Sequence, residues 1–342
     1  MKIIFMPSLP LIKRDYIGLG IEYFYTRGYD VSVLETHQLL LQGYKNKVDI
    51  EYFRFENTYE PPSIKDLLDI ISELTEEDNI MYYLASKDAV QLLNKMKIHT
   101  KAKFITYISG SIPATSAPCG FKNKIKSFLR PMIKKYIDVT FDSDIVVTGA
   151  PKDELIFPFL FGKNTKKLHF HSRDYELCIN TQDFVYDKEY CVFLDTDAIN
   201  ASDYIIFGTE SEKKIKEYQD KLITFFKWIE KTINIVVIIS AHPKSRIFKD
   251  TNNFRGFKVV HNQSESLVKN SKFVLNEGTT AISFAVYFEK PLLFFQMEEL
   301  NFFYNTTCSY AKQFDKKIIY IDDIATIDID DIYANINNID KY

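Results

Sequence analysis

Two short stretches of the sequence carry residue types that bind phosphate. In the first, IVVIISAHPKSR, an apolar run ends abruptly in His242, Pro243, Lys244 and Arg246. Proline stops a strand and fixes the loop that follows, so His242 is expected to point out of the sheet. Two cations beside an imidazole suit a phosphate or diphosphate better than an apolar ligand. The alternative is a histidine that merely caps the strand end.

The second stretch is KFVLNEGTTAISFAVYF, in which a short apolar strand ends in Glu277 and Gly278. Thr279 and Thr280 then open an apolar helix that is expected to run to about Phe288. Free amides at a helix N-terminus together with two hydroxyls form an anion site, and glycine allows close approach of the backbone. Alternatively, Thr279 only caps the helix, as threonine does in many folds.

A third candidate is Asp195-Thr196-Asp197, which follows the strand-like run YCVFL. Two aspartates at this spacing can hold a divalent cation against a diphosphate through hard oxygen ligands. A second D-x-D lies at Asp328 and Asp330 in a peripheral position, so the spacing alone is weak evidence. We therefore predict hydrogen bonding within the loop and no metal site, and keep Asp195 as a donor contact.

The elements that must position these residues alternate strand and helix along the whole chain. Six strand-like runs precede residue 172 and six more follow residue 189, with helical patterns between them. This alternation predicts an α/β protein built from parallel sheets, with two Rossmann-like domains facing each other across a cleft. We expect one domain at 1–175, a second at 189–330, and a polar linker at about 172–188.

Such a fold predicts where the catalytic groups lie. Ligands of open parallel sheets collect at the carboxyl ends of the strands, where His242 is placed as a catalytic and donor-binding residue. If the protein transfers a group to a hydroxyl with inversion, the catalytic base would come from the N-terminal domain. Asp15 and Glu35 are the best-placed candidates. His169, His171 and Asp174 form a weaker constellation.

Composition narrows the class of protein. The 342 residues carry a net charge of −3, which argues against a general nucleic-acid binder. The chain has four scattered cysteines without zinc-like spacing, which are expected to be reduced thiols: Cys119, Cys178, Cys191 and Cys308. No apolar run reaches the length of a membrane span and no secretory signal opens the sequence, so we expect a cytoplasmic protein.

One segment could bind a membrane surface. Between Phe121 and Ile137, apolar residues at helical spacing are flanked by six cations and no acid. This pattern is typical of an interfacial helix on anionic lipid, which would make the protein peripheral to the inner face of the cytoplasmic membrane. We favour the alternative of a helix packed on the N-terminal sheet with its lysines in solvent, since every surface helix is amphipathic.

The order of motifs from about Tyr190 to Ile321 resembles the donor-binding half of bacterial GT-B transferases of surface polymers. That group includes sialyl-, polysialyl- and Kdo-transferases and CDP-glycerol glycerophosphotransferases. The resemblance rests on His242-Pro243 and on Thr279-Thr280, with Glu277 and Gly278 where the group often has other residues. It implies that His242 contacts the donor phosphate and that the two threonines hold phosphate through hydroxyl and amide groups.

The resemblance implies a metal-independent glycosyltransferase, with an acceptor-binding domain at 1–175 and a nucleotide-donor-binding domain at 189–330. It would move a sugar, for example a nonulosonic acid, from a nucleotide sugar to a surface glycan or lipid-linked glycan such as capsule or lipopolysaccharide. No cofactor is expected, because the nucleotide sugar is the substrate. The alternatives are a polyol-phosphate transferase with a CDP donor, a nucleotide-sugar 2-epimerase, and a nucleotide-sugar-binding protein without turnover.

Overall fold

The computed structural model describes residues 1–7, 10–40, 52–82, 87–108, 140–149, 162–197, 212–242, 254, 256–298 and 304–337. The described residues divide into two compact units, the first ending at Arg173 and the second beginning at Asp174. Each unit is built on one parallel sheet, so the prediction of an α/β protein with two Rossmann-like halves is confirmed. Pro243, Lys244, Cys119 and the segment 121–137 lie outside the described residues.

The first unit holds a parallel sheet of seven strands in the order β3-β2-β1-β4-β5-β6-β7. Its elements are β1 (Lys2–Met6), α1 (Lys13–Gly18), α2 (Ile21–Thr26), β2 (Asp30–Leu34), α3 (His37–Leu40), β3 (Thr58–Tyr59), α5 (Ile64–Ser72), β4 (Asn79–Tyr82), α6 (Lys87–His99), β5 (Lys103–Ile108), β6 (Ile145–Thr148) and β7 (Lys166–His169).

The second unit holds a parallel sheet of six strands in the order β10-β9-β8-β11-β12-β13. Its elements are β8 (Tyr190–Leu194), α11 (Glu212–Ile229), the π-helical turn η2 (Glu230–Asn234), β9 (Val236–Ser240), β10 (Lys258–Val260), α12 (Ser264–Asn270), β11 (Val274–Asn276), α13 (Ile282–Tyr287), β12 (Leu292–Gln296), α14 (Tyr304–Gln313), β13 (Ile319–Tyr320), the 3-10 turn η4 (Ile324–Thr326) and α15 (Ile329–Asn337).

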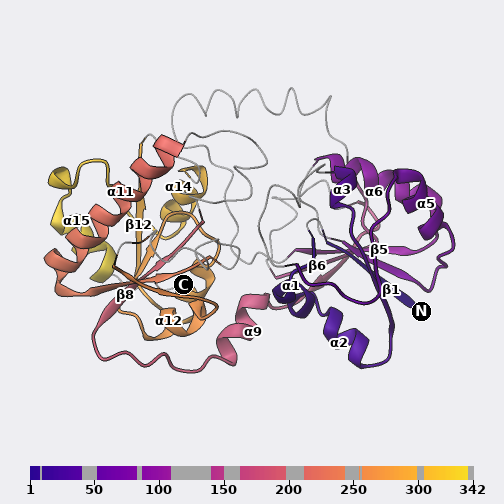
Figure 1. Cartoon of the computed structure of the whole chain (residues 1–342), viewed down its shortest axis with the longest axis horizontal. Helices are drawn as coiled ribbons and strands as arrows, with labels where there is room; N and C mark the ends of the chain where they lie inside the picture. The colour runs from indigo at the N-terminus through magenta and orange to yellow at the C-terminus, as the bar shows by residue number, and fades with distance from the viewer. Residues whose placement is uncertain are drawn as a thin grey trace. The chain divides into compact units, whose positions relative to one another are not determined.

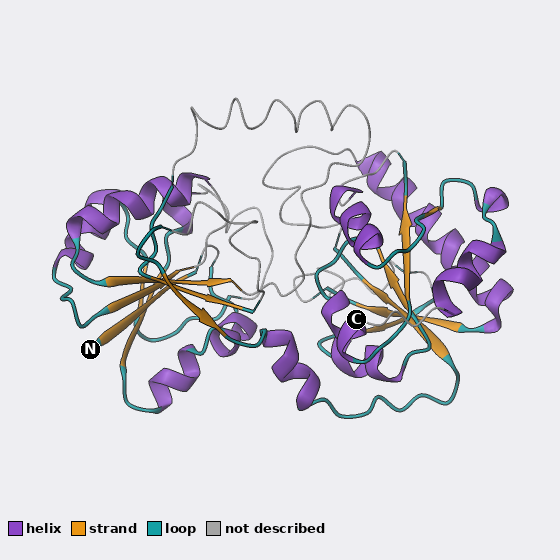
Figure 2. Cartoon of the chain, turned by 180° about the vertical axis from the view of Figure 1, so that it is seen from behind, coloured by secondary structure: helices purple, strands orange, loops and turns teal. Residues whose placement is uncertain are grey.

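Both sheets are covered by helices on both faces (Figures 1 and 2). In the first unit, Ile4 and Met6 of β1 pack in the core beneath α5 and α6, whereas Ile3 and Phe5 pack against α1 and α2. Successive strand residues point to opposite faces, so a strand covered on both sides must be apolar throughout. This explains why the central strands read as continuous apolar runs.

The same alternation builds the second unit. Cys191 and Phe193 of β8 pack in the core formed with α11 and α15, on one face of the sheet. On the other face, the Tyr190 hydroxyl donates to the main-chain oxygen of Leu267 in α12 at 2.9 Å. Figure 1 shows α11 and α15 on one side of this sheet and α12 on the other.

The strand order of the second unit creates a topological switch. The chain passes from β8 outward through β9 and β10, then returns to the other side of β8 with β11. β9 and β11 therefore lie on opposite sides of β8, and open parallel sheets bind ligands at the carboxyl ends of the strands at such a switch point.

Two elements differ from the sequence prediction. The strand β3 spans only two residues, which is too short for an alternating sequence pattern. It is defined by its pairing with β2. Helix α9 (Arg173–Ile179) lies in the segment that we predicted to be an irregular linker. It is held by contacts with α13, in which Ser283 donates to Asp174 and the Tyr175 and Tyr287 rings lie 5.6 Å apart, contacts that local periodicity cannot reveal.

The described cysteines Cys178, Cys191 and Cys308 are buried and no disulfide joins them. Burial raises the pKa of the Cys178 thiol to about 12, so this side chain behaves as a small apolar residue. Among the described residues, no helix combines the length and the hydropathy that crossing a bilayer requires.

Phe193 packs among other aromatic rings in the core of the second unit. Its ring is fully buried, 5.0 Å from that of Phe226 and 5.8 Å from that of Phe295. We expect Phe193→Ala to lower the free energy of unfolding by about 3–5 kcal/mol, because the lost contacts leave a cavity. Urea denaturation followed by fluorescence measures this. The control Val185→Ala, at a side chain 86% exposed, is expected to change it by less than about 0.5 kcal/mol.

Candidate functional site

The residues that directly follow β8, β9 and β11 lie at the same end of the second sheet. Leu194 of β8 pairs with Ser240 of β9, and the amide of Asp195 donates to Ser240 O at 3.0 Å. On the other side of β8, Phe193 pairs with Leu275 of β11, and continuing this register places Glu277 beside Asp195. The predicted residues that follow β8, β9 and β11 are thus brought to one edge of the sheet.

Asp195 joins the end of β8 to the end of β9. Its side chain is buried, its Oδ1 accepts from the amide of Asp197 at 2.9 Å, and its Oδ2 accepts from the amide of His242 at 3.3 Å. Asp197 has φ 55, so the backbone turns sharply here. The Asp195 carboxylate is therefore used for loop hydrogen bonding, and it fixes the backbone that carries the His242 imidazole.

Glu277 is a buried carboxyl group that meets Tyr218 of α11. The exposed fraction of Glu277 is 2%, and the Tyr218 hydroxyl donates to its Oε2. Burial raises the pKa of Glu277 to about 8; the bond from Tyr218 opposes this rise and the charge of Asp195 adds to it. Burial likewise raises the pKa of Asp195 to about 6, against the two amides that it accepts from. At neutral pH Glu277 is thus mostly protonated.

The turn after β11 is organised by Asn276, which sequence reasoning missed. Its Oδ1 accepts from the amide of Gly278 at 2.6 Å, and its Nδ2 donates to Thr279 O at 3.3 Å. Gly278 has φ 98, a conformation that only glycine adopts without strain. An asparagine two residues before a glycine is the pattern of a side chain that closes a turn, and this signal was available in the sequence.

Thr279 and Thr280 lie in the turn that precedes α13, which begins two residues later than predicted. The Thr279 hydroxyl accepts from the amide of Ala281 at 3.3 Å, and Ala281 itself caps the helix without a side-chain bond. Thr279 is half-buried and Thr280 is exposed. Because α13 has only six residues, its dipole contributes little, and the hydroxyls and main-chain amides of the turn are the groups that an anion would use.

The candidate bases of the first unit lie in different surroundings. Asp15 is in α1, 3.8 Å from the guanidinium of Arg173. Glu35 follows β2 and is buried; its Oε1 accepts from the amide of Leu11 at 2.8 Å, and its Oε2 lies 3.6 Å from Nδ1 of the buried His37. Glu35 therefore holds the loop after β1 in place, in addition to any part in catalysis.

Glu35 also belongs to the group of described residues with donor atoms close enough to hold a metal ion. One ligand atom each from Glu35, His37 and Glu60 lie within 4.8 Å of one another. Imidazole and carboxylate are ligands that zinc accepts. Glu60 is exposed, whereas the other two are buried.

The histidines of the weaker constellation are exposed. The ring of His171 stacks on that of Phe170 at 4.5 Å, and His169 is exposed at the end of β7. Asp174 accepts a hydrogen bond from Ser283. The two histidines thus lie on the surface, whereas Asp174 helps to attach α9 to α13.

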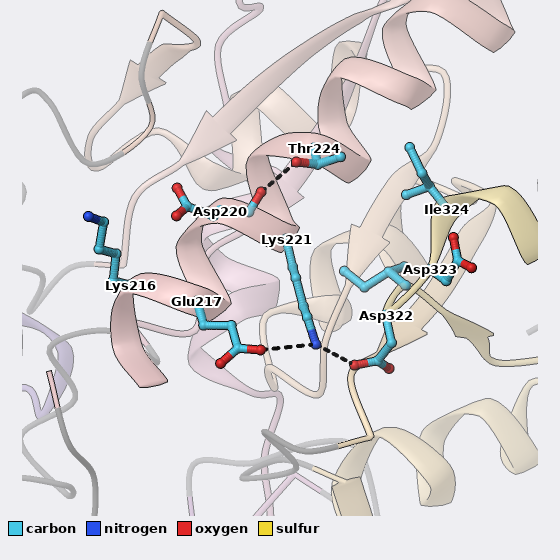
Figure 3. A pocket seen from close by; sticks show the side chains of 9 residues that line it. Lys216, Glu217, Asp220, Lys221, Thr224, Asp322, Asp323 and Ile324 are labelled. Atoms are coloured by element: carbon cyan, nitrogen blue, oxygen red, sulfur yellow. Dashed lines mark hydrogen bonds and ion pairs between the residues drawn. The ribbon is translucent and has the colours of Figure 1, made fainter. Parts of the chain in front are cut away.

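A pocket of about 530 Å³ lies on α11 beside the loop after β13 (Figure 3). Lys221 crosses it, with Nζ 2.9 Å from Asp322 Oδ1 and 3.6 Å from Glu217 Oε1. Its charged lining has four carboxylates and two ammonium groups: Glu217, Asp220, Asp322 and Asp323 against Lys216 and Lys221. This excess of negative charge opposes a phosphate, and none of the candidate phosphate-binding residues lines the pocket.

The comparisons with known proteins show the fold. No protein-family model matches the chain, and no curated protein does. The structure of UDP-GlcNAc 2-epimerase from Methanocaldococcus jannaschii aligns with a TM-score of 0.50 and 12% identity, over 99% of this chain and 93% of that one. The fold is GT-B-like.

Two further solved structures align less closely. The glycosyltransferase of kitacinnamycin has a TM-score of 0.48 and 11% identity, over 98% of this chain and 89% of that one. The wall teichoic acid polymerase TagF has a TM-score of 0.40 and 12% identity, over 86% of this chain and 69% of that one. At these identities the alignments describe architecture and leave the chemistry to the site residues.

The buried Glu277 carboxyl predicts a pH-dependent stability. An unfolded glutamate ionises near pH 4.5, whereas Glu277 ionises near pH 8. Its contribution to stability is therefore fully present below about pH 4.5 and is lost as the pH rises to about 8, at about 1.4 kcal/mol per pH unit. Glu277→Gln removes this loss, so the variant is expected to gain stability relative to the wild type as the pH rises from 5 to 8.

Thermal unfolding across this pH range measures the effect. The control Glu289→Gln changes an exposed glutamate of the same unit and is expected to follow the wild-type curve. Parallel curves for Glu277→Gln and the wild type would contradict the raised pKa of Glu277.

Proposed function

We propose that this protein is a glycosyltransferase that moves a sugar from a nucleotide-sugar donor to a cell-surface glycan. The observation that carries the proposal is that Asp195 accepts from the amide of His242 and, by the register of β8 and β11, lies beside Glu277, which opens the turn with the two threonines. Parallel sheets bind nucleotides at such a switch point. The resemblance of these motifs to surface-polymer transferases points to the same edge of the sheet.

The chemistry of sugar transfer explains these residue types. When a nucleotide leaves a sugar carbon, negative charge grows on its phosphate, and fixed hydrogen-bond donors there stabilise the transition state more than the ground state. The His242 imidazole, the Thr279 and Thr280 hydroxyls and the amides of their turn would supply these donors. Pro243 and Lys244 would continue the same site.

We propose that the donor phosphate is held by these groups without a metal. Asp195 supports this because both of its oxygens already accept from main-chain amides. The acceptor hydroxyl would be activated by a residue of the first unit, for which Asp15 and Glu35 are the candidates. Glu35 would need to exchange the Leu11 amide for the acceptor, whereas Asp15 would need to leave Arg173.

Calorimetry with CMP-, CDP-, UDP-, GDP- and dTDP-linked donors tests the proposal. We expect one of these classes to bind, and expect its sugar to be transferred to a glycan acceptor. Transfer of a polyol phosphate from a CDP donor, a change of configuration in the donor without an acceptor, or binding without turnover would each replace it by a different function. Failure of every nucleotide to bind would reject all four.

His242→Ala is expected to lower kcat/KM roughly 100-fold while the melting temperature stays unchanged. The fold is kept because His242 bonds to Asp195 through its main-chain amide, which alanine retains. The control is His99→Ala, since His99 is exposed at the end of α6, just before the amino end of β5 in the first unit. A His242 variant that unfolds would show that the imidazole is structural.

A further inference from the structure

Helix α11 brings a tyrosine to the candidate donor site. Tyr218, Leu222 and Phe225 recur at helical spacing on the buried face of the helix and pack in the second core. Glu217 and Lys221 lie beside this face and line the pocket of Figure 3. The orientation of Tyr218 is thus set by the apolar face of the whole helix.

The Tyr218 hydroxyl forms a hydrogen bond with the Glu277 carboxyl group of the candidate site. The ring is 4% exposed, and its hydroxyl donates to Glu277 Oε2, 59 residues further along the chain. Glu277 directly precedes Gly278, whose amide is held by Asn276 in the turn that carries the two threonines. Tyr218 therefore fixes the side chain at the base of the turn that the donor phosphate would contact.

We propose that Tyr218 is a positioning residue of the donor site and that it couples donor binding to the protonation of Glu277. This inference rests on the proposed function. Neutral Glu277 leaves the turn without a negative charge, whereas an ionised Glu277 repels a phosphate held by the next three residues. The titratable groups that face Glu277 among the described residues are Asp195 at the end of β8 and Tyr218 on α11.

The sign of the coupling follows from the hydrogen bond. The Tyr218 hydroxyl stabilises the ionised form of Glu277 and so lowers its pKa, against the rise caused by burial. Removing the hydroxyl raises this pKa further. Donor affinity of the wild type is therefore expected to fall as the pH rises through about 8, and in Tyr218→Phe this fall moves to higher pH.

Calorimetric titration with UDP, CDP, CMP, GDP and dTDP between pH 6 and 10 tests the proposal on the full chain. At pH 6.5 we expect Tyr218→Phe to bind the preferred nucleotide roughly tenfold more weakly, since the turn loses a fixed neighbour. Tyr190→Phe is the matched control, because it removes another buried tyrosine hydroxyl, which bonds to α12 away from the site. It is expected to keep the wild-type affinity and pH profile.

Glu277→Gln provides a second test that does not depend on the folding of Tyr218→Phe. This variant is expected to lose the fall in nucleotide affinity that the wild type shows as the pH rises through about 8. Retention of the wild-type pH dependence, or loss of binding at all pH values, would overturn the coupling.

The two proposals fail in different ways. If the wild type binds nucleotide but Tyr218→Phe keeps both its affinity and its pH midpoint, the positioning role is wrong and the proposed function stands. If the wild type binds none of the five nucleotides, both are wrong.

Discussion

The second unit depends on the burial of two carboxyl groups at the switch point of its sheet. Asp195 accepts main-chain amides from its own loop and from His242, so one side chain fixes the ends of β8 and β9 together. Glu277 follows β11, at the position beside Asp195 when the register of β8 and β11 is continued. It accepts a hydrogen bond from the Tyr218 hydroxyl. Buried carboxyl groups are costly unless they are hydrogen-bonded or neutral, and here one is bonded by amides while the other is held protonated.

This arrangement gives the site its electrostatic character. A phosphate at the carboxyl edge of the sheet would meet an imidazole, two hydroxyls and main-chain amides, close to carboxyl groups that the fold has partly neutralised. Raised pKa values of grouped acids are typical of functional sites, because ionised acids would repel an anionic ligand. The acidic pocket on α11 provides the contrast, since its Glu217 and Asp322 carboxylates are partly exposed and pair with Lys221.

The first unit also has a buried carboxyl group after a strand, and this group holds a loop in place. Glu35, at the end of β2, accepts the amide of Leu11 and so ties the loop after β1 to the neighbouring strand. His37 and Glu60 lie next to it at the ends of α3 and β3. The strand-end rule thus located a polar cluster in both units, but the surroundings of each side chain determine whether it can reach a substrate.

The residue pattern was enough to predict the fold class, the described strands other than β3, and the stretches that end them, because a strand buried on both faces must be apolar and its ends are marked by polar and turn residues. His242, Asp195 and Glu277–Thr280 were predicted in this way. Tyr218 and helix α9 depended on tertiary structure, since the first looks like any core residue of an amphipathic helix and the second is held by α13. Contacts between residues 59 or 109 positions apart leave no local pattern, so only the folded chain decides which buried tyrosine meets a carboxyl group.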